Sequence, residues 1–234
     1  MLLELGGVRL LTDPVLRTRV AHLRRHGEAP EVPADIDAVL LSHLHHDHLD
    51  RPSLRRLAGP PRLIAPRGTR RLVRRLGVVV DQLRPGDRAE VNGVPVHAVR
   101  AVHGSSRLWR AGPSGEPLGF VVGEAPSVYF AGDTDLFPEM ERLAPLDVAL
   151  LPVAGWGPKL GPGHMDPARA AQAVALLRAR VAIPIHWGTL RPRYTRLGDW
   201  FSSPPGEFAA QVAAVAPESE VRVLRPGDST SVGA

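Results

Sequence analysis

The stretch VLLSHLHHDHLD, residues 39–50, places four histidines and one aspartate within six consecutive residues, directly after an apolar run. The apolar run, residues 38–41, predicts a buried strand. A loop that leaves such a strand can direct several side chains into one cleft. Histidine supplies imidazole nitrogen and aspartate supplies anionic oxygen, and Zn²⁺ and related cations accept both kinds of ligand. Burying these groups without a partner would be costly, so the stretch predicts a metal site.

The spacing within the stretch suggests how its residues divide between two ions. His43 and His45 are two residues apart and can reach one ion. Asp47 and His48 lie where the loop turns into a helix and can reach a second ion, whereas His46 is expected to point elsewhere. The alternative is a solvated histidine-rich loop, which the H-x-H-x-D-H spacing after a strand disfavours.

The composition excludes several classes of protein. The chain has 234 residues and no cysteine, so it has neither disulfides nor thiolate metal ligands, which is compatible with a reducing cytoplasm. Residues 1–14 lack the basic region and cleavage site of a signal peptide. No apolar run approaches the ~20 residues that span a bilayer. We therefore expect a cytoplasmic protein without a transmembrane segment.

The net charge of +5 comes almost entirely from arginine, because Lys159 is the only lysine. A basic balance suits an anionic substrate, nucleic acid or a lipid surface, but the excess here is small. We expect a small-molecule anionic or ester substrate and no obligatory nucleic acid partner, and we leave homo-oligomer formation open.

The order of the expected elements repeats along the chain. Each half, about residues 1–115 and 116–234, reads as strands followed by helix–strand units, and residues 17–35 read as a loop. Asp50 is expected to cap a short helix, and Asp166 the clearest helix of the chain. Two such halves packed sheet to sheet predict one α/β domain over residues 1–234, a four-layer αββα sandwich with the helices outside.

The motif carries a family resemblance that extends along most of the chain. SHLHHDHLD resembles the H-x-H-x-D-H signature of the metallo-β-lactamase fold hydrolases, and AVHGS, YFAGDTD and IPIHWGT follow in the family's order. The resemblance implies that the first metal is held by His43, His45 and His103. It further implies that the second metal is held by Asp47, His48 and His186, and that Asp133 bridges the two.

The residues themselves are compatible with these roles. His103, Asp133 and His186 each lie where an expected strand gives way to a turn with glycine, which lets the backbone approach a site closely. Alone, His103 could belong to a surface loop, Asp133 could cap a helix, and His186 could be a core histidine. The histidine cluster at residues 43–48 makes ligands the better interpretation of all three.

Four longer segments indicate a narrower resemblance. LLTDPVL, DIDAVLLSHLHHDHLD, GHMDPARAAQAV and IPIHWGTL resemble the branch of N-acyl phosphatidylethanolamine phospholipase D and ascorbate-6-phosphate lactonase. This resemblance implies a catalytic or substrate-binding role for His164 and an orienting role for Asp13 toward a ligand imidazole. The alternatives are that the segment with His164 only caps the helix through Asp166, and that Asp13 forms a turn before Pro14.

The resemblance implies a hydrolase with two divalent metal ions, Zn most of all, with Mn or Fe as alternatives. A hydroxide that bridges the ions would attack an ester-like bond, with a phosphodiester as the first choice. A lactone of the ascorbate-6-phosphate type is the second choice, and an RNA or nucleotide phosphodiester a further one. Asp47 could move the proton of the nucleophile and His164 could protonate the leaving group. Trp187 and Arg107 are candidate substrate contacts, as are Trp109 and Trp156.

Three rival functions remain to be compared with hydrolysis. Di-iron oxidoreductases of the same superfamily carry a carboxylate where His45 stands, which favours hydrolysis. The arginines of residues 70–76 are the best support for a nucleic-acid processing enzyme. A non-enzymatic module usually loses ligands, whereas all seven candidates are present here.

The chain departs from the family pattern in two ways. It begins at MLLELGG without the family's Gly-His-Ser element, and it lacks an evident apolar membrane-docking segment, which weakens a lipid substrate.

Overall fold

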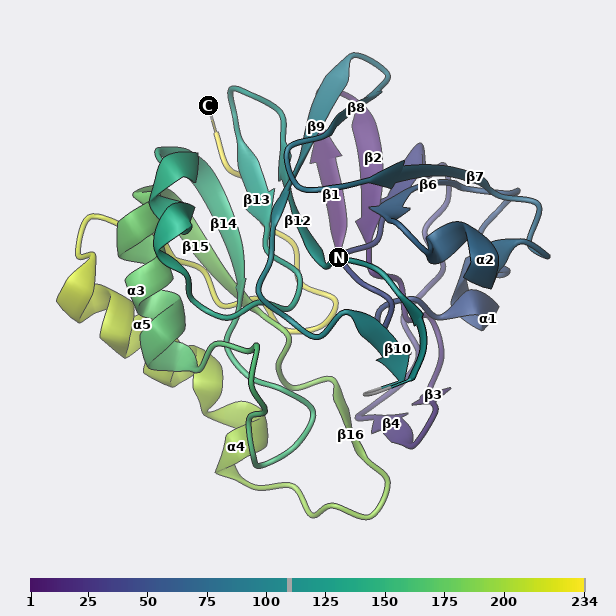
Figure 1. Ribbon diagram of the computed structural model, residues 1–234. Coiled ribbons are helices and arrows are strands. Elements are labelled where there is room, and N and C mark those ends of the chain that lie inside the picture. The colour runs from purple at the N-terminus through teal and green to yellow at the C-terminus, as the bar shows by residue number, and fades with distance from the viewer. Residues whose placement is uncertain (109–110, 234) are drawn as a thin grey trace.

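The computed structural model describes residues 1–108 and 111–233, and its core consists of two large β-sheets with helices on the outside. One sheet has the order β1-β2-β5-β6-β7 and the other β17-β15-β14-β13-β12-β9-β8. In Figure 1 the helices α3 and α5 cover one side of the molecule and α1 and α2 the other, with the strands between them. The expected αββα sandwich is therefore confirmed.

The first sheet is parallel except for its edge hairpin. β1 pairs antiparallel with β2, and β2, β5, β6 and β7 run parallel. The inner strands read as nearly continuous apolar runs because both of their faces are covered. The elements of this half are β1 (Leu2–Leu5), β2 (Val8–Thr12), β5 (Ala38–Leu40), α1 (Arg51–Leu54), β6 (Arg62–Pro66), α2 (Thr69–Val73) and β7 (Val79–Leu83).

The second sheet combines an antiparallel part, β8-β9-β12-β13, with a parallel part, β13-β14-β15-β17. Its strands are β8 (Arg88–Val91), β9 (Val94–Arg100), β12 (Leu118–Val122), β13 (Val128–Phe130), β14 (Leu146–Pro152), β15 (Ala179–Ile185) and β17 (Glu220–Val221). Its helical elements are the 3₁₀ helix η1 (Pro138–Leu143), α3 (Pro167–Leu177), α4 (Asp199–Ser202) and α5 (Pro204–Val215).

Three buried clusters hold the layers together. The cluster between the sheets includes Leu10, Leu40 and Ile64 from the first sheet and Phe120 and Leu150 from the second. A second cluster packs the outer helices α3 and α5 on the large sheet, and a third packs α1 and α2 on the small one. Each sheet therefore buries both faces, which explains the apolar strands in the sequence.

The expectation that residues 17–35 form only a loop is wrong. Two short strands, β3 (Arg19–Val20) and β4 (Leu23–Arg25), pair with β16 (Leu190–Pro192) in a three-stranded sheet. Arg24 of β4 lies opposite Arg191 of β16. This pairing depends on a segment far away in the sequence, so no local pattern could predict it. A further hairpin joins β10 (Ser106–Leu108) and β11 (Ala111–Ser114).

The two expected helix caps are present. Asp50 accepts a hydrogen bond from the backbone N–H of Ser53 at the start of α1, and Asp166 accepts one from Arg169 at the start of α3. These bonds satisfy amide groups that the first turn of a helix leaves without a partner. Within the described part of the chain, no helix is long and apolar enough to cross a membrane.

Candidate metal centre

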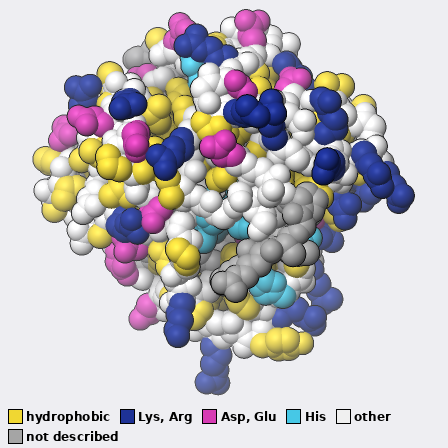
Figure 2. All heavy atoms as spheres, viewed as in Figure 1, with side chains coloured by type: hydrophobic (Ala, Val, Ile, Leu, Met, Phe, Trp, Pro, Cys, Tyr) yellow, Lys and Arg dark blue, Asp and Glu magenta, His cyan; other side chains and the backbone are white. Residues whose placement is uncertain are grey.

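The candidate ligands lie in loops that leave strand ends at one edge of the sandwich. His43, His45 and His48 follow β5, and His103 follows β9. Asp133 follows β13 and His186 follows β15 directly. Since β9, β13 and β15 run in the same direction, their carboxyl ends meet at one edge of the large sheet. The two sheets thus bring together side chains that are far apart in the sequence, and histidine side chains are visible near the middle of the face shown in Figure 2.

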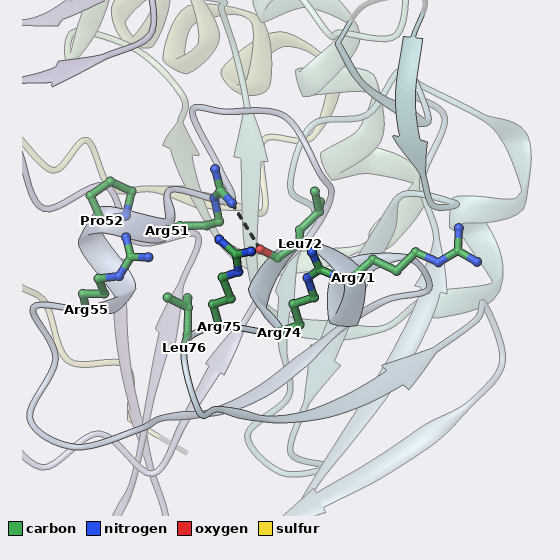
Figure 3. A pocket seen from close by; sticks show the side chains of 8 residues that line it. All are labelled: Arg51, Pro52, Arg55, Arg71, Leu72, Arg74, Arg75 and Leu76. Atoms are coloured by element: carbon green, nitrogen blue, oxygen red, sulfur yellow. Dashed lines mark hydrogen bonds between the residues drawn. The ribbon is translucent and has the colours of Figure 1, made fainter.

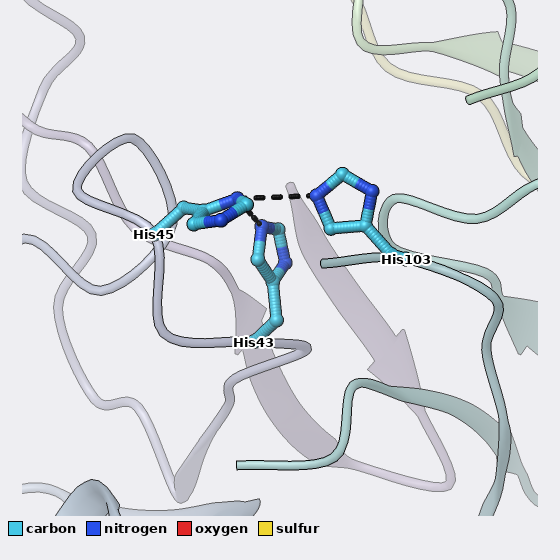
Figure 4. A group of neighbouring side chains, drawn as sticks. All are labelled: His43, His45 and His103. Atoms are coloured by element: carbon cyan, nitrogen blue, oxygen red, sulfur yellow. Dashed lines mark hydrogen bonds between the residues drawn. The ribbon is translucent and has the colours of Figure 1, made fainter. Parts of the chain in front are cut away.

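Three imidazoles converge on one point. His45 Nδ1 lies 2.9 Å from His43 Nε2 and 3.1 Å from His103 Nε2. Figure 4 shows the three rings pointing toward one another from two separate loops. The three nitrogens form one of the groups whose ligand atoms all lie within 4.8 Å of one another.

Asp133 lies at the centre of the site. Its Oδ2 is 3.2 Å from His48 Nε2, 3.8 Å from His103 Nε2 and 4.0 Å from His43 Nε2. Its Oδ1 is 3.3 Å from His186 Nε2. The side chain is only 3% exposed. A single carboxylate therefore faces nitrogens from both predicted halves of the site.

A second group of possible ligands lies on the other side of Asp133. The ligand atoms of Asp47, His48 and His186 gather within 4.8 Å of one another. Asp47 Oδ2 is 3.8 Å from His48 Nε2, and the rings of His48 and His186 stack with centroids 5.4 Å apart. The structure thus brings the two predicted ligand sets together as two adjacent groups.

Hydrogen bonds on the outward-facing ring nitrogens fix which nitrogen of each imidazole carries the hydrogen. His103 Nδ1 lies 2.7 Å from the carbonyl oxygen of Gly163, and His186 Nδ1 lies 2.8 Å from that of Ala154. A carbonyl oxygen only accepts hydrogen bonds, so each Nδ1 donates. In the neutral ring the lone pair is then on Nε2, which points into the site. This is the tautomer that binds a metal.

Asp13 and Ser42 orient two further imidazoles in the same way. Asp13 accepts hydrogen bonds from His48 Nδ1, at 2.6 Å, from the backbone N–H of Ser42, at 2.8 Å, and from the Ser42 hydroxyl. Because the hydroxyl donates to Asp13, it can accept from His43 Nδ1, 2.9 Å away. Nε2 of His43 is then unprotonated and points toward His45. The orienting role expected for Asp13 corresponds to these contacts, while the role of Ser42 was missed.

The site contains buried polar atoms that the protein itself does not satisfy. His48 Nε2 and Asp133 Oδ1 are buried and form no hydrogen bond with any described residue. Such atoms are costly in a folded protein unless something binds them. Unprotonated imidazole nitrogens and a carboxylate that converge without donors fit a divalent cation. The donor set contains only nitrogen and oxygen, which Zn²⁺, Mn²⁺ and Fe²⁺ all accept.

The protonation states differ within the cluster. Burial lowers the pKa of His43 well below its usual range and that of His103 to about 4. Burial also opposes protonation of His48, but the carboxylates of Asp133, Asp13 and Asp47 outweigh it and raise the His48 pKa well above its ordinary value. Burial would raise the Asp133 pKa, but His186 and His48 outweigh it and hold that pKa well below its usual value.

His186 is held in an unusual backbone conformation. Its φ is +60°, a region that residues other than glycine rarely adopt and that costs on the order of 1–3 kcal/mol. In this conformation Nδ1 donates a hydrogen bond to the Ala154 carbonyl oxygen and Nε2 points toward the Asp133 carboxylate. Strain of this kind is concentrated at functional sites, where the surrounding structure maintains it.

His164 lies beside the cluster, as the narrower resemblance implied. Its Nε2 is 3.5 Å from Asp133 Oδ2, and its ring lies edge-on to His103 with centroids 4.6 Å apart. Its Nδ1 is 3.1 Å from the Gly161 carbonyl oxygen. Burial opposes protonation of this ring, but the hydrogen bond and charge of Asp133 raise its pKa above the ordinary value. The helix cap comes from Asp166 and leaves His164 free to face the site.

Trp187 and Trp156 contact groups outside the ligand cluster. Trp187 packs against the core cluster beneath α3 and α5, and its ring N–H donates to the Pro184 carbonyl. Trp156 lies edge-on to His22. Arg107 is part of β10, but its side chain and the whole of Trp109 lie outside the described residues. Among the described residues, His46 belongs to none of the groups that could hold a metal.

The comparisons with known proteins agree with this geometry. The β-lactamase superfamily domain matches residues 8–187. A UPF0173 metal-dependent hydrolase of Methanopyrus kandleri is 34% identical over 97% of this chain and 93% of its own. Another from Opitutus terrae is 34% identical over 99% and 95%. Neither carries a phospholipase or lactonase name, so the narrower branch stays a prediction.

Two solved structures show the same fold. A metallo hydrolase from Ignicoccus hospitalis has a TM-score of 0.72 at 24% identity and covers 97% of this chain and 91% of its own. An isothiocyanate hydrolase from Delia radicum gut bacteria has a TM-score of 0.73 at 20% identity, over 100% and 96%. At these identities the likeness concerns the fold alone.

We expect Asp133→Asn to lose bound metal while the chain stays folded. Asparagine keeps the shape of the side chain but removes the charge that faces four of the six candidate ligand residues other than Asp133. Since residues that merely orient a ligand contribute about 10–100-fold in metal affinity, this loss should exceed about 100-fold. Metal content after dialysis, measured by plasma mass spectrometry, tests it. His97→Gln on β9 is the control and should keep its metal. Equal metal content in both variants would contradict the site.

We also expect cation binding to release protons at pH 7. In the cation-free protein the raised pKa of His48 keeps the imidazole in its doubly protonated form, with a proton on Nε2 as well as on Nδ1. A cation that binds Nε2 must displace that proton. The affinity should therefore fall as the pH is lowered and reach a plateau only above the raised pKa. Calorimetric titration with Zn²⁺ in two buffers of different ionisation enthalpy measures the released protons. Identical heats in the two buffers would show that no proton is displaced.

Proposed function

The chain belongs to the β-lactamase superfamily and is a metal-dependent hydrolase of the metallo-β-lactamase fold, and we propose that its strand-end cluster is the active site of a two-metal enzyme. His43, His45 and His103 would hold one divalent cation, and Asp47, His48 and His186 a second, with Asp133 between them. Zn²⁺ is the first choice, with Mn²⁺ or Fe²⁺ as alternatives. The observation that carries the proposal is the position of the buried Asp133 carboxylate among imidazoles of both groups.

When bound, such cations act as Lewis acids, polarise the bond under attack and lower the pKa of water from about 15.7 toward about 7. The side chains of this protein supply binding, orientation and proton transfer. Asp13, Ser42 and the carbonyl groups of Gly163 and Ala154 hold the imidazoles in the binding tautomer. The ligands are thus oriented before a substrate arrives, which avoids reorganisation during the reaction.

We propose that two groups move protons. Asp47 Oδ2 faces the same space as His48 Nε2, 3.8 Å away, and can accept a proton from the attacking water. His164 Nε2 lies 3.5 Å from Asp133 Oδ2 and can donate a proton to the leaving oxygen. General acid and base catalysis of this kind contributes about 10²–10⁴-fold to a rate. The pair therefore suits bonds whose leaving group is a poor one, such as an alkoxide.

We propose an ester-like bond as the target, with a phosphodiester first and a lactone second. An alkyl phosphodiester releases an alkoxide that needs a proton, which His164 is placed to supply. The lactone is the alternative because the segment around His164 resembles the branch that holds both activities. We further propose a small-molecule substrate, a cytoplasmic location suited to a cysteine-free chain, and one domain over residues 1–234.

A substrate screen with metal analysis tests the proposed function. The zinc-loaded protein should contain two metal ions per chain and hydrolyse bis(p-nitrophenyl) phosphate. Chelation or Asp133→Asn should abolish turnover, and His97→Gln should not. Turnover of simple lactones without any phosphodiester activity would shift the assignment to a lactonase. Full turnover by Asp133→Asn would overturn the site itself.

The role proposed for His164 predicts a dependence on the leaving group. In His164→Gln we expect an activity loss of about 10²-fold or more on substrates with alkyl leaving groups, because their oxygen must be protonated. Substrates that release p-nitrophenolate need no proton, so their turnover should change little. Metal content should stay at the wild-type level. An equal loss on both substrate types would contradict a proton donor and indicate a structural role.

A further inference from the structure

A groove between α1 and α2 is lined mostly by arginine side chains. It has a volume of about 380 Å³ and is lined by Arg51, Arg55, Arg71, Arg74 and Arg75. In Figure 2 several Lys and Arg side chains lie along the right of the molecule, the side on which Figure 1 places these helices. Figure 3 shows four of the five side chains over the space between the helices, while Arg71 extends to the side.

These arginines lack the partners that neighbouring arginines have. All five are exposed, and none forms an ion pair with a carboxylate within residues 1–108 and 111–233. Arg51 only approaches the Leu72 carbonyl oxygen, at 3.5 Å. By contrast, Arg17 is paired with Asp50 and Arg62 with Asp81.

The surroundings of the groove do not neutralise it. Residues 51–58 and 67–79 contain no acidic side chain, and Asp50 is already bound by Arg17 and Ser53. A guanidinium group stays charged at any physiological pH. Five such groups around one concavity repel each other, and a concave surface focuses their positive potential. An anion that binds there would relieve this repulsion.

The chemistry of the groove favours phosphate groups. The planar guanidinium fork matches phosphate oxygens in a bidentate way, and these charge-assisted bonds are among the strongest that side chains form. Leu72, Leu76 and Pro52 add apolar surface between the charges. The volume lies within the range of about 300–1,000 Å³ that is typical of small-molecule sites.

We propose that the groove between α1 and α2 binds a small molecule with two or three linked phosphate groups. None of the candidate metal ligands lines this groove, and the buried side chains of Leu54 and Val73 on the inner faces of α1 and α2 pack into the core cluster over the first sheet. The arginines therefore lie on the outer surface of the helical layer, whereas the ligand cluster lies at the strand ends.

Calorimetric titration of the metal-loaded protein with tripolyphosphate tests the proposal. Tripolyphosphate should bind more tightly than inorganic phosphate, and its affinity should fall as salt is raised from about 50 to 200 mM. The double variant Arg51→Gln/Arg75→Gln should weaken binding at least about tenfold, because each substitution removes charge-assisted hydrogen bonds between a guanidinium group and a phosphate. Arg142→Gln on η1 removes an exposed arginine elsewhere and should leave binding unchanged.

Other outcomes would overturn the proposal. If the double variant binds tripolyphosphate with the same heat and affinity as the wild type, the tripolyphosphate binds at the metal centre and not in the groove. If a single-stranded RNA or phosphatidylglycerol vesicles bind through these arginines and tripolyphosphate does not, the groove is a nucleic-acid or lipid surface instead. Hydrolytic activity and melting temperature of the double variant should match those of the wild type, which separates failure of this site from failure of the proposed function.

Discussion

The buried carboxylate of Asp133 is the constraint on which the site depends. It is 3% exposed, one of its oxygens has no hydrogen-bond partner among the described residues, and imidazole nitrogens face it from three loops. Isolated, a buried anion of this kind would be strongly destabilising. The Nε2 atoms of His43, His103 and His186 do not satisfy it either, because in the tautomer that their outer nitrogens fix they bring lone pairs and not hydrogens. A cation shared by the nitrogens and the carboxylate resolves both problems at once, and this explains why a fold would maintain such an arrangement.

The two sheets position this carboxylate through a close contact of backbone. Gly132, just before Asp133, has φ +61°, and a Cβ atom there would lie 2.4 Å from Cβ of Ser42. Only glycine lets the loop after β13 reach the loop after β5 so closely. Gly163 also lies in tight contact with a ligand segment, because a Cβ there would lie 3.1 Å from His103 Nδ1. The loops that carry the candidate ligands are therefore held close together by packing. Groups on these same segments orient the imidazoles.

The charged groups of the protein are organised in two contrasting ways. In the strand-end cluster the charges are buried, and four of the imidazoles are fixed by a specific hydrogen bond on the outer nitrogen: His43, His48, His103 and His186. In the groove between α1 and α2 the arginines are exposed and long, and they gather around a concavity without fixed partners. The first arrangement suits a small divalent cation that accepts imidazole nitrogen and carboxylate oxygen, and the second suits a larger, flexible anion.

The sequence by itself determined what depends on neighbouring residues. The apolar run before His43, the caps Asp50 and Asp166 and the repeated order of strands and helices are local patterns, and they predicted the layered fold. The candidate ligands could be named because their motifs resemble those of the metallo-β-lactamase fold hydrolases, and each of them follows an expected strand. Tertiary structure alone decided what joins distant segments. The Gly163 carbonyl that orients His103 is 60 residues away, β4 pairs with β16, and the arginines of two separate helices meet in one groove. Contacts of this kind depend on how the elements pack together, and the spacing of residues along the chain contains no information about them.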